Sequence, residues 1–192
     1  MPNLCNFSMM VIGEEEKLDE FIEILHNDYD NLHMFRIFEA YEEYREELDD
    51  NKMVCLLNGE CAWSVFVCMF PGEYTYYDSE KDSPTKTNIL IESERLGLDI
   101  EIFSEECGMC FMEHYIIKSG ELIVDEESTY KIFCTADYET VEEFNKDTGL
   151  NISKDIFEKR DYITKGGFPW KFTIYDYTIG DILPNDFYHV SE

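Results

Sequence analysis

Basic residues are scarce in this chain. Its 192 residues include 15 Lys and Arg against 43 Asp and Glu, for a formal net charge of −28. Proteins that bind nucleic acid directly present a basic face, and attraction to anionic membranes also requires clustered Lys or Arg. The composition therefore excludes direct nucleic-acid and membrane binding and favours a basic partner. The simpler interpretation is that acidic residues keep the protein in solution.

Long apolar runs are also missing. No stretch approaches the ~18 residues that a membrane-spanning helix needs. The opening MPNLCNFSMM has no basic region of the kind that begins a secretory signal. The cysteines number seven, an odd count that argues against a complete disulfide framework. These features predict reduced thiols and a location in the host-cell cytosol.

Familiar catalytic motifs are absent from the sequence. It has no Gly-rich phosphate loop, no H-E-x-x-H, no G-x-S-x-G and no EF-hand pattern. No spacing of Ser and His suggests a catalytic triad. The sequence thus predicts a non-enzymatic protein without a cofactor.

One constellation is compatible with zinc or another divalent metal. Cys107, Cys110 and His114 have C-x-x-C-x-x-x-H spacing, but zinc usually has four ligands in two such pairs. A second pair is absent from the sequence, so a fourth ligand would have to approach in space, from Cys61, Cys68 or Cys134. The alternative is an inert turn.

Carboxylates surround the same turn. They are Glu105, Glu106 and Glu113, beside His114, and such a group can hold a divalent metal or perform acid–base chemistry. In so acidic a chain, neighbouring carboxylates also arise by chance. A small metal-dependent enzyme centred here is therefore an alternative function.

Core-forming residues are abundant. Hydrophobic residues make up 44% of the chain and aromatic residues 15%, which predicts a folded protein rich in strands. The apolar stretch 58–70, NGECAWSVFVCMF, is predicted to be the central strand of a sheet, covered on both faces. Asn58-Gly59 favours a two-residue hairpin turn, with residues 52–57 as the partner strand.

Periodicity predicts the remaining elements. Strands are expected at residues 6–12, 33–38, 99–103, 110–118, 121–125, 130–135 and 170–177, with a turn at Ser119-Gly120. Helices are expected at residues 14–27, 88–96, 141–148 and 155–159. This order predicts an α+β fold, with a ferredoxin-like antiparallel sheet and helices on one face over residues 1–136. Residues 137–192 would be a C-terminal α+β extension packed on the same domain. The second face of the sheet must then meet this extension or a second copy of the chain in a homodimer.

Residues 39–50, EAYEEYREELDD, form the densest acidic patch. The segment is either a helix with acid on most of its surface or a long strand end and loop. Its acidic residues would contact the partner, and a tyrosine would anchor the interface. The predicted partner-binding residues are Glu39, Glu42, Glu43, Tyr44, Glu46, Glu47, Asp49 and Asp50.

Three blocks of the sequence resemble a known family. They are M-P-N-L-C at residues 1–5 followed by V-I-G at 11–13, C-A-W-S-V at 61–65, and F-S-E-E at 103–106 followed by Gly108, Phe111 and E-H-Y at 113–115. Together they are similar to the YubB-type ferredoxin-like family of plasmid and phage proteins, with Leu4 where that family has Trp. The resemblance implies a ferredoxin-like fold and an origin on a mobile element. It implies no activity.

Charge and resemblance together suggest a function. We expect an acidic mobile-element protein that binds and inhibits a host nucleic-acid-binding defence protein, such as a CRISPR or restriction nuclease. Carboxylates on a rigid scaffold would occupy the basic channel of that nuclease by imitating nucleic acid. The non-enzymatic alternative is a structural or accessory homo-oligomeric module of a mobile element.

Overall fold

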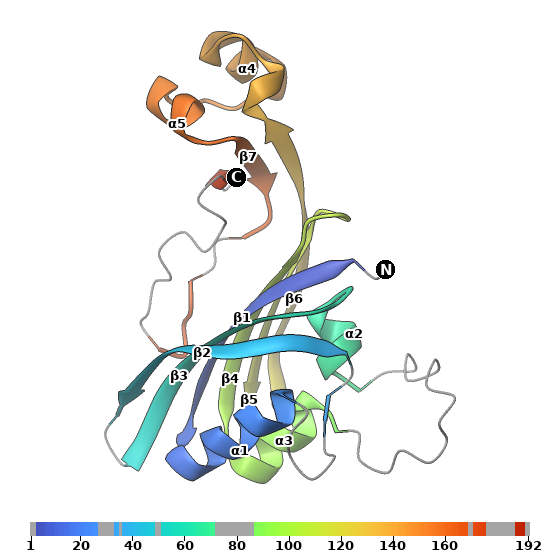
Figure 1. Ribbon diagram of the computed structural model, residues 1–192, viewed down its shortest axis with the longest axis vertical. Coiled ribbons are helices and arrows are strands. Elements are labelled where there is room, and N and C mark those ends of the chain that lie inside the picture. The colour runs from blue at the N-terminus through green and yellow to red at the C-terminus, as the bar shows by residue number, and fades with distance from the viewer. Residues whose placement is uncertain are drawn as a thin grey trace. The chain divides into compact units, whose positions relative to one another are not determined.

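The computed structural model describes residues 3–26, 33–34, 36–48, 51–71, 87–168, 171–175 and 187–190 (Figure 1). The chain divides into two compact units. The first comprises Met1–Glu127 with Phe172–Asp176, and the second comprises Ser128–Lys171 with Tyr177–Glu192. The predicted division into a core of residues 1–136 and an extension of residues 137–192 stays a prediction.

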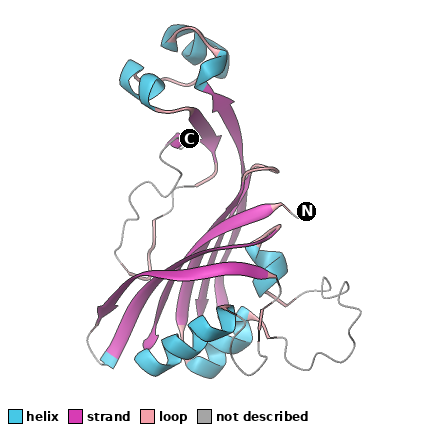
Figure 2. Ribbon diagram, in the orientation of Figure 1, coloured by secondary structure: helices cyan, strands magenta, loops and turns pink. Residues whose placement is uncertain are grey.

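An antiparallel sheet dominates the first unit, as the broad magenta arrows of Figure 2 show. The strand order is β2-β3-β1-β4-β5-β6, so β1 and β4 lie in the middle of these six strands. The bounds are β1 Leu4–Glu14, β2 Ile37–Glu47, β3 Lys52–Ala62, β4 Asp99–Glu106, β5 Phe111–Lys118 and β6 Glu121–Cys134. With few helices beside these strands, the predicted α+β class with an antiparallel sheet is confirmed.

Three helices accompany this sheet: α1 Glu15–Leu25, α2 Val65–Met69 and α3 Ile89–Leu96. The side chain of Asn88 accepts hydrogen bonds from the first amides of α3, and Gly97 ends the helix with φ 66°, a left-handed conformation that glycine adopts without strain. Helix α1 buries an apolar stripe that includes Leu18 and Phe21. Both predicted helices are confirmed to within two residues at each end.

Alternate residues of β1 form the main hydrophobic core. Phe7, Met9 and Val11 leave the strand on one side, because side chains alternate between the faces of a sheet. They pack in one cluster with residues of α1, α2 and α3, including Phe21 and Met69. This cluster joins the three helices to one face of the sheet.

The opposite face of the sheet is also buried. Met10, Leu56 and Phe103 are almost fully shielded from solvent there. Phe172, from the C-terminal part of the chain, packs edge-on against Phe103 with 5.3 Å between ring centroids. A C-terminal segment thus covers part of this face. This covering was one of the two that the sequence predicted. The other, a second copy of the chain in a homodimer, stays a prediction.

The predicted central strand at residues 58–70 is wrong. Asn58 and Gly59 lie inside β3, and the hairpin between β2 and β3 turns at Asn51, which has φ 59°. Position 59 has no room for a side chain, because an added Cβ would overlap the carbonyl oxygen of Glu39. Beyond Trp63, Ser64 caps the short helix α2 by accepting from the Val67 amide. A short apolar run fits a buried strand and a buried helix equally well, so its pattern could not separate the two.

Other predicted bounds shift for local reasons. Arg36 and Cys110 have positive φ values of 50° and 56°, so β2 and β5 begin one residue later, and the strand predicted from residue 33 is shortened. The strands predicted at 121–125 and 130–135 are a single strand, β6. Residues 171–175, the described part of the strand predicted at 170–177, form bends rather than a strand.

The second unit is a small α+β structure. The end of β6 pairs antiparallel with β7 Tyr162–Gly166, which pairs in parallel with β8 Phe187–Val190. A short 3-10 turn, Thr135–Asp137, precedes α4 Val141–Thr148 and α5 Lys154–Lys159. Phe144 is fully buried among the rings of Phe133, Tyr138 and Phe157. Both helices were predicted, whereas β7 and β8 were not.

No helix in the described parts of the chain is both long enough and apolar enough to cross a membrane.

Candidate partner-binding surface

The predicted partner-binding residues lie on the edge strand β2. This strand is first in the sheet order, and among the described strands it pairs with β3 alone. The strand interpretation of residues 39–50 therefore holds over Glu39 to Glu47, and the helix interpretation is wrong. The exposed side chains are those of Glu39, Glu42, Glu43, Glu46 and Glu47, with Tyr44 half-buried. Asp49 and Asp50 lie outside the described residues.

Two carboxylates on the helix-bearing side are tied to an arginine. Glu42 pairs with Leu57 and Arg45 with Cys55 in the register, so both side chains lie on the face of the main core. Arg45 Nη2 lies 2.6 Å from Glu42 Oε2, and its Nη1 lies 2.8 Å from Asp19 of α1. The hydrogen bonds that Arg45 donates to Glu42 raise the pKa of Arg45. Arg45 thus offsets part of the negative charge on this side.

The other side of β2 keeps its negative charge. Tyr44 and Tyr175 both donate hydrogen bonds to Glu46, the latter at 2.9 Å. These bonds favour the ionised carboxylate and lower the pKa of Glu46. Asn58 of β3 donates to Glu43. Polar neighbours therefore hold two of the predicted carboxylates in place.

Register shifts explain why the acid appears on both sides. The pairing of β2 with β3 slips between Ile37 and Glu39 and again between Glu42 and Tyr44. Each shift changes which face the following residues occupy. The acidic patch therefore lies on both sides of the sheet edge. The density of acidic residues in the sequence could not predict this.

The residues proposed as metal ligands do not assemble. Cys107 and Cys110 lie in the turn between β4 and β5, and the Cys110 thiol donates to the Cys107 carbonyl oxygen at 3.4 Å. The His114 imidazole instead lies flat on Phe103, with 4.2 Å between ring centroids. Among the described residues, no group of three or more His, Cys, Asp or Glu is placed to hold a metal ion.

The carboxylates near that turn have structural partners. Glu106 accepts from the amides of Gly108 and Met109, at 2.9 and 2.5 Å, which closes the turn. Glu113 is buried and accepts from the Val65 amide at 2.9 Å and from Ser104 Oγ at 2.6 Å. Burial raises the pKa of Glu113 even though these bonds oppose the shift. The geometry favours a structural role for these side chains over acid–base catalysis.

A His–Glu pair that sequence reasoning did not identify lies on the second face of the sheet. His114 Nε2 lies 2.8 Å from Glu101 Oε1, and His114 Nδ1 lies 3.2 Å from Glu126. Burial lowers the pKa of His114, but the two carboxylates outweigh it and the net shift is upward. Burial opposes ionisation of Glu101, yet His114 and the amides of Ile174 and Thr173 lower its pKa. The pair fastens the C-terminal segment to the sheet.

The alternative metal ligands have other surroundings in the structure. Cys61 and Cys68 are buried, and Cys68 donates to the Ala62 carbonyl oxygen at 2.8 Å. Hydrogen bonds that the Cys61 thiol makes with Cys5 and Cys68, together with burial, raise the pKa of Cys61. Cys134 lies at the end of β6, in the second unit. All seven cysteines are free thiols.

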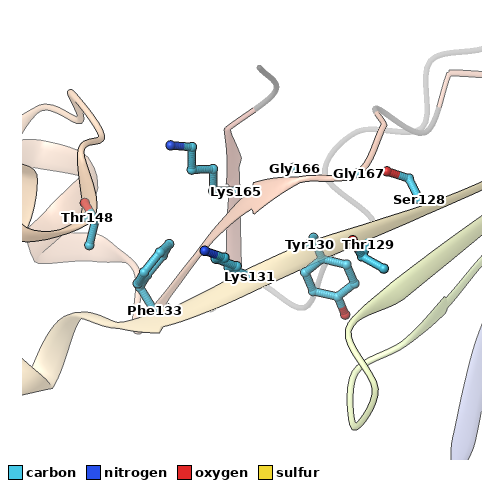
Figure 3. Close-up of a pocket in the computed structure, with 9 residues that line it drawn as sticks. All are labelled: Ser128, Thr129, Tyr130, Lys131, Phe133, Thr148, Lys165, Gly166 and Gly167. Atoms are coloured by element: carbon cyan, nitrogen blue, oxygen red, sulfur yellow. The ribbon is translucent and has the colours of Figure 1, made fainter.

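The second unit contains a cavity of about 490 Å³ that the sequence did not reveal (Figure 3). Lys131 of β6 and Lys165 of β7 lie directly opposite each other on its wall. The only sequence signal was a pair of lysines in different segments. Their proximity depends on the pairing of β6 with β7, and β7 was not predicted.

No protein-family model, curated protein or solved structure matches this chain.

Proposed function

We propose that this protein binds a basic nucleic-acid-binding protein through the acidic edge of β2 and blocks it by imitating nucleic acid. The observation that carries the proposal is the run of exposed carboxylates on one edge strand of a rigid sheet, in a chain of net charge −28. A nuclease of a restriction or CRISPR system has the basic channel that such a surface fits.

The length of the acidic run supports mimicry. Residues in a strand advance by about 3.3 Å each, so the eight steps from Glu39 to Glu47 cover about 26 Å and carry five carboxylates. Phosphates along one strand of B-DNA advance by about 3.4 Å, so this run extends over several phosphates. Because Arg45 offsets Glu42, the carboxylates of Glu39, Glu43 and Glu47 carry the attraction together with Glu46.

We propose a ferredoxin-like fold, with helices on one face, for the first unit. The first four strands follow the pattern strand–helix–strand–strand–helix–strand and lie in the order β2-β3-β1-β4. The apolar residues that α1, α2 and α3 bury all belong to one core cluster. The seven free thiols support a reducing compartment, and we propose the host cytosol, where a defence nuclease would be met.

A pair of charge-reversal variants tests the function. One variant changes Glu39, Glu43 and Glu47 to Lys. Its control changes three exposed carboxylates elsewhere, Glu23, Glu121 and Glu142, to Lys. Both variants have a net charge of −22, because each substitution adds two charges to −28. Only the position of the change differs between them.

The assay is capture of host proteins on the tagged chain at low and high salt, with DNA as competitor. We expect the unaltered chain and the control to retain a basic nucleic-acid-binding protein that salt or DNA releases. The β2 variant should lose it. Equal retention by both variants would refute a β2 interface, and capture of no nucleic-acid-binding protein at low salt would refute the proposed function.

A further inference from the structure

We propose that the cavity of the second unit binds a small phosphorylated molecule, whose phosphate group lies between Lys131 and Lys165. This site is independent of the acidic edge of β2. It concerns a different unit of the chain and the opposite sign of charge.

The two lysines are held together by the sheet. Lys131 and Lys165 are direct partners in the antiparallel pairing of β6 with β7, so their Cβ atoms lie about 5 Å apart on one face. Figure 3 shows their side chains next to each other, with both ammonium groups directed toward the side on which Thr148 lies. Like charges placed directly opposite each other destabilise a strand pair, and an anion between them reverses that effect.

No described residue of the lining neutralises these charges. Among the described residues, nine line the cavity, and none of them is Asp or Glu, although the chain has 43 acidic residues. No ion pair joins either lysine to a carboxylate in the described parts of the chain. The described wall of the cavity therefore carries two positive charges and no negative charge.

The remaining lining fits a phosphorylated organic molecule. A phosphate monoester carries close to two negative charges at neutral pH, which matches two ammonium groups. Ser128 and Thr129 add hydroxyl groups to the wall, and Phe133 adds an aromatic ring on the same face as Lys131. The cavity volume of about 490 Å³ exceeds what phosphate alone would fill and falls within the range of small-molecule sites.

The anion is a small molecule and not a polymer. A nucleic-acid strand would extend beyond the cavity onto a surface whose overall charge repels it. A single phosphate group on a nucleoside-sized body would remain within the cavity. The site would thus bind one class of anion, small phosphorylated molecules, in a chain whose net charge repels anions.

Titration of the full-length chain tests the site. The probes are adenosine monophosphate, inorganic phosphate, adenosine and acetate, followed by calorimetry and by amide NMR shifts. We expect adenosine monophosphate to bind more tightly than inorganic phosphate, and adenosine and acetate to bind far more weakly. In the unaltered chain, the amide signals of Thr148, Gly166 and Gly167 should move on titration.

Single lysine variants assign the binding. Lys131→Gln and Lys165→Gln should each weaken binding of adenosine monophosphate about tenfold, which is the typical effect of losing one charged hydrogen bond. The matched control, Lys146→Gln, removes one exposed lysine of α4 outside the cavity and should leave the affinity unchanged.

Three results would overturn the proposal. The first is an absence of shifts at the cavity amides with either phosphate probe, a result that does not depend on any variant. The second is equal weakening by Lys146→Gln and the two cavity variants. The third is binding of acetate as tight as that of inorganic phosphate, which would point to any anion.

Discussion

Replacing Gly59 with alanine should destabilise the protein, because this glycine gives β2 and Phe7 the space they occupy. Gly59 lies opposite Phe7 on β1 and opposite Ala40 on β2. A Cβ at position 59 would overlap the Glu39 carbonyl oxygen and the Phe7 ring, whose Cε1 would lie 2.9 Å away. The ring is buried in the main core, and the carbonyl belongs to the backbone of a paired strand. Neither can move without disturbing its neighbours.

The expected loss follows from two opposing effects. Overfilling a packed core costs about 1–3 kcal/mol, and overlap with backbone places Gly59 at the upper end of that range. Replacing glycine inside a strand gains about 0.5–1 kcal/mol from backbone entropy. The net loss should be about 2 kcal/mol in the free energy of unfolding. For a chain of this size, that lowers Tm by about 4–8 °C.

Urea unfolding followed by far-UV circular dichroism measures the change. Gly59→Asn provides the sharpest comparison, because a hairpin turn at this position would tolerate asparagine, whereas a strand interior would not. We expect Asn to be more damaging than Ala. A double-mutant cycle with Phe7→Leu should recover the part of the loss that the ring causes and leave the part caused by the carbonyl.

Two outcomes would refute this reasoning. A Gly59→Ala variant as stable as the unaltered chain, or more stable, would mean that the space is not needed. An Asn variant more stable than the Ala variant would indicate a positive φ at this residue and restore the hairpin predicted at Asn58-Gly59.

Three further predictions concern buried polar groups and a helix cap. Glu113→Ala should lower the free energy of unfolding by about 3 kcal/mol in urea titrations, since several buried donors lose their acceptor. Asn88→Ala should cost about 1 kcal/mol by the same assay and Asn88→Ser much less, because serine also caps helices. The pKa of His114 is raised from 6.5 and that of Glu101 is lowered from 4.5, so their contribution should be complete between these values. It should decrease as pH rises through the raised pKa of His114 or falls through the lowered pKa of Glu101, and unfolding curves of His114→Gln should lack the decrease at high pH.

The sequence predicted elements whose signals are local. Helix α3 has its capping Asn88 and terminal Gly97, and the hairpin between β5 and β6 has Ser119-Gly120, so each could be placed without knowledge of the rest of the chain. Asn58-Gly59 shows where this fails. Glycine fits a turn because its backbone is free to adopt positive φ, and it also fits a crowded strand because it has no side chain. At Gly59 the close approach of β2 shows that the second reason applies.

The candidate sites show the same limit. Charge density located the acidic segment, but the register shifts that distribute Glu42 and Glu46 to opposite faces depend on pairing with β3. The opposition of Lys131 and Lys165 depends on pairing between segments more than 30 residues apart. Which distant segments lie next to each other depends on the tertiary structure. Neither the composition nor the periodicity of the sequence predicts it.

The contact of Phe172 with Phe103 has a consequence for synthesis on the ribosome. All six strands of the first unit begin before residue 122, so most of its sheet can form while the C-terminal segment is still being made. Translation from residue 127 to residue 175 takes roughly 2 to 10 seconds. During that time Phe103 lacks the ring of Phe172, and Glu101 lacks the amides of Thr173 and Ile174. The nascent chain would therefore expose the apolar surface around Phe103 to chaperones until residues 172–174 have left the ribosome.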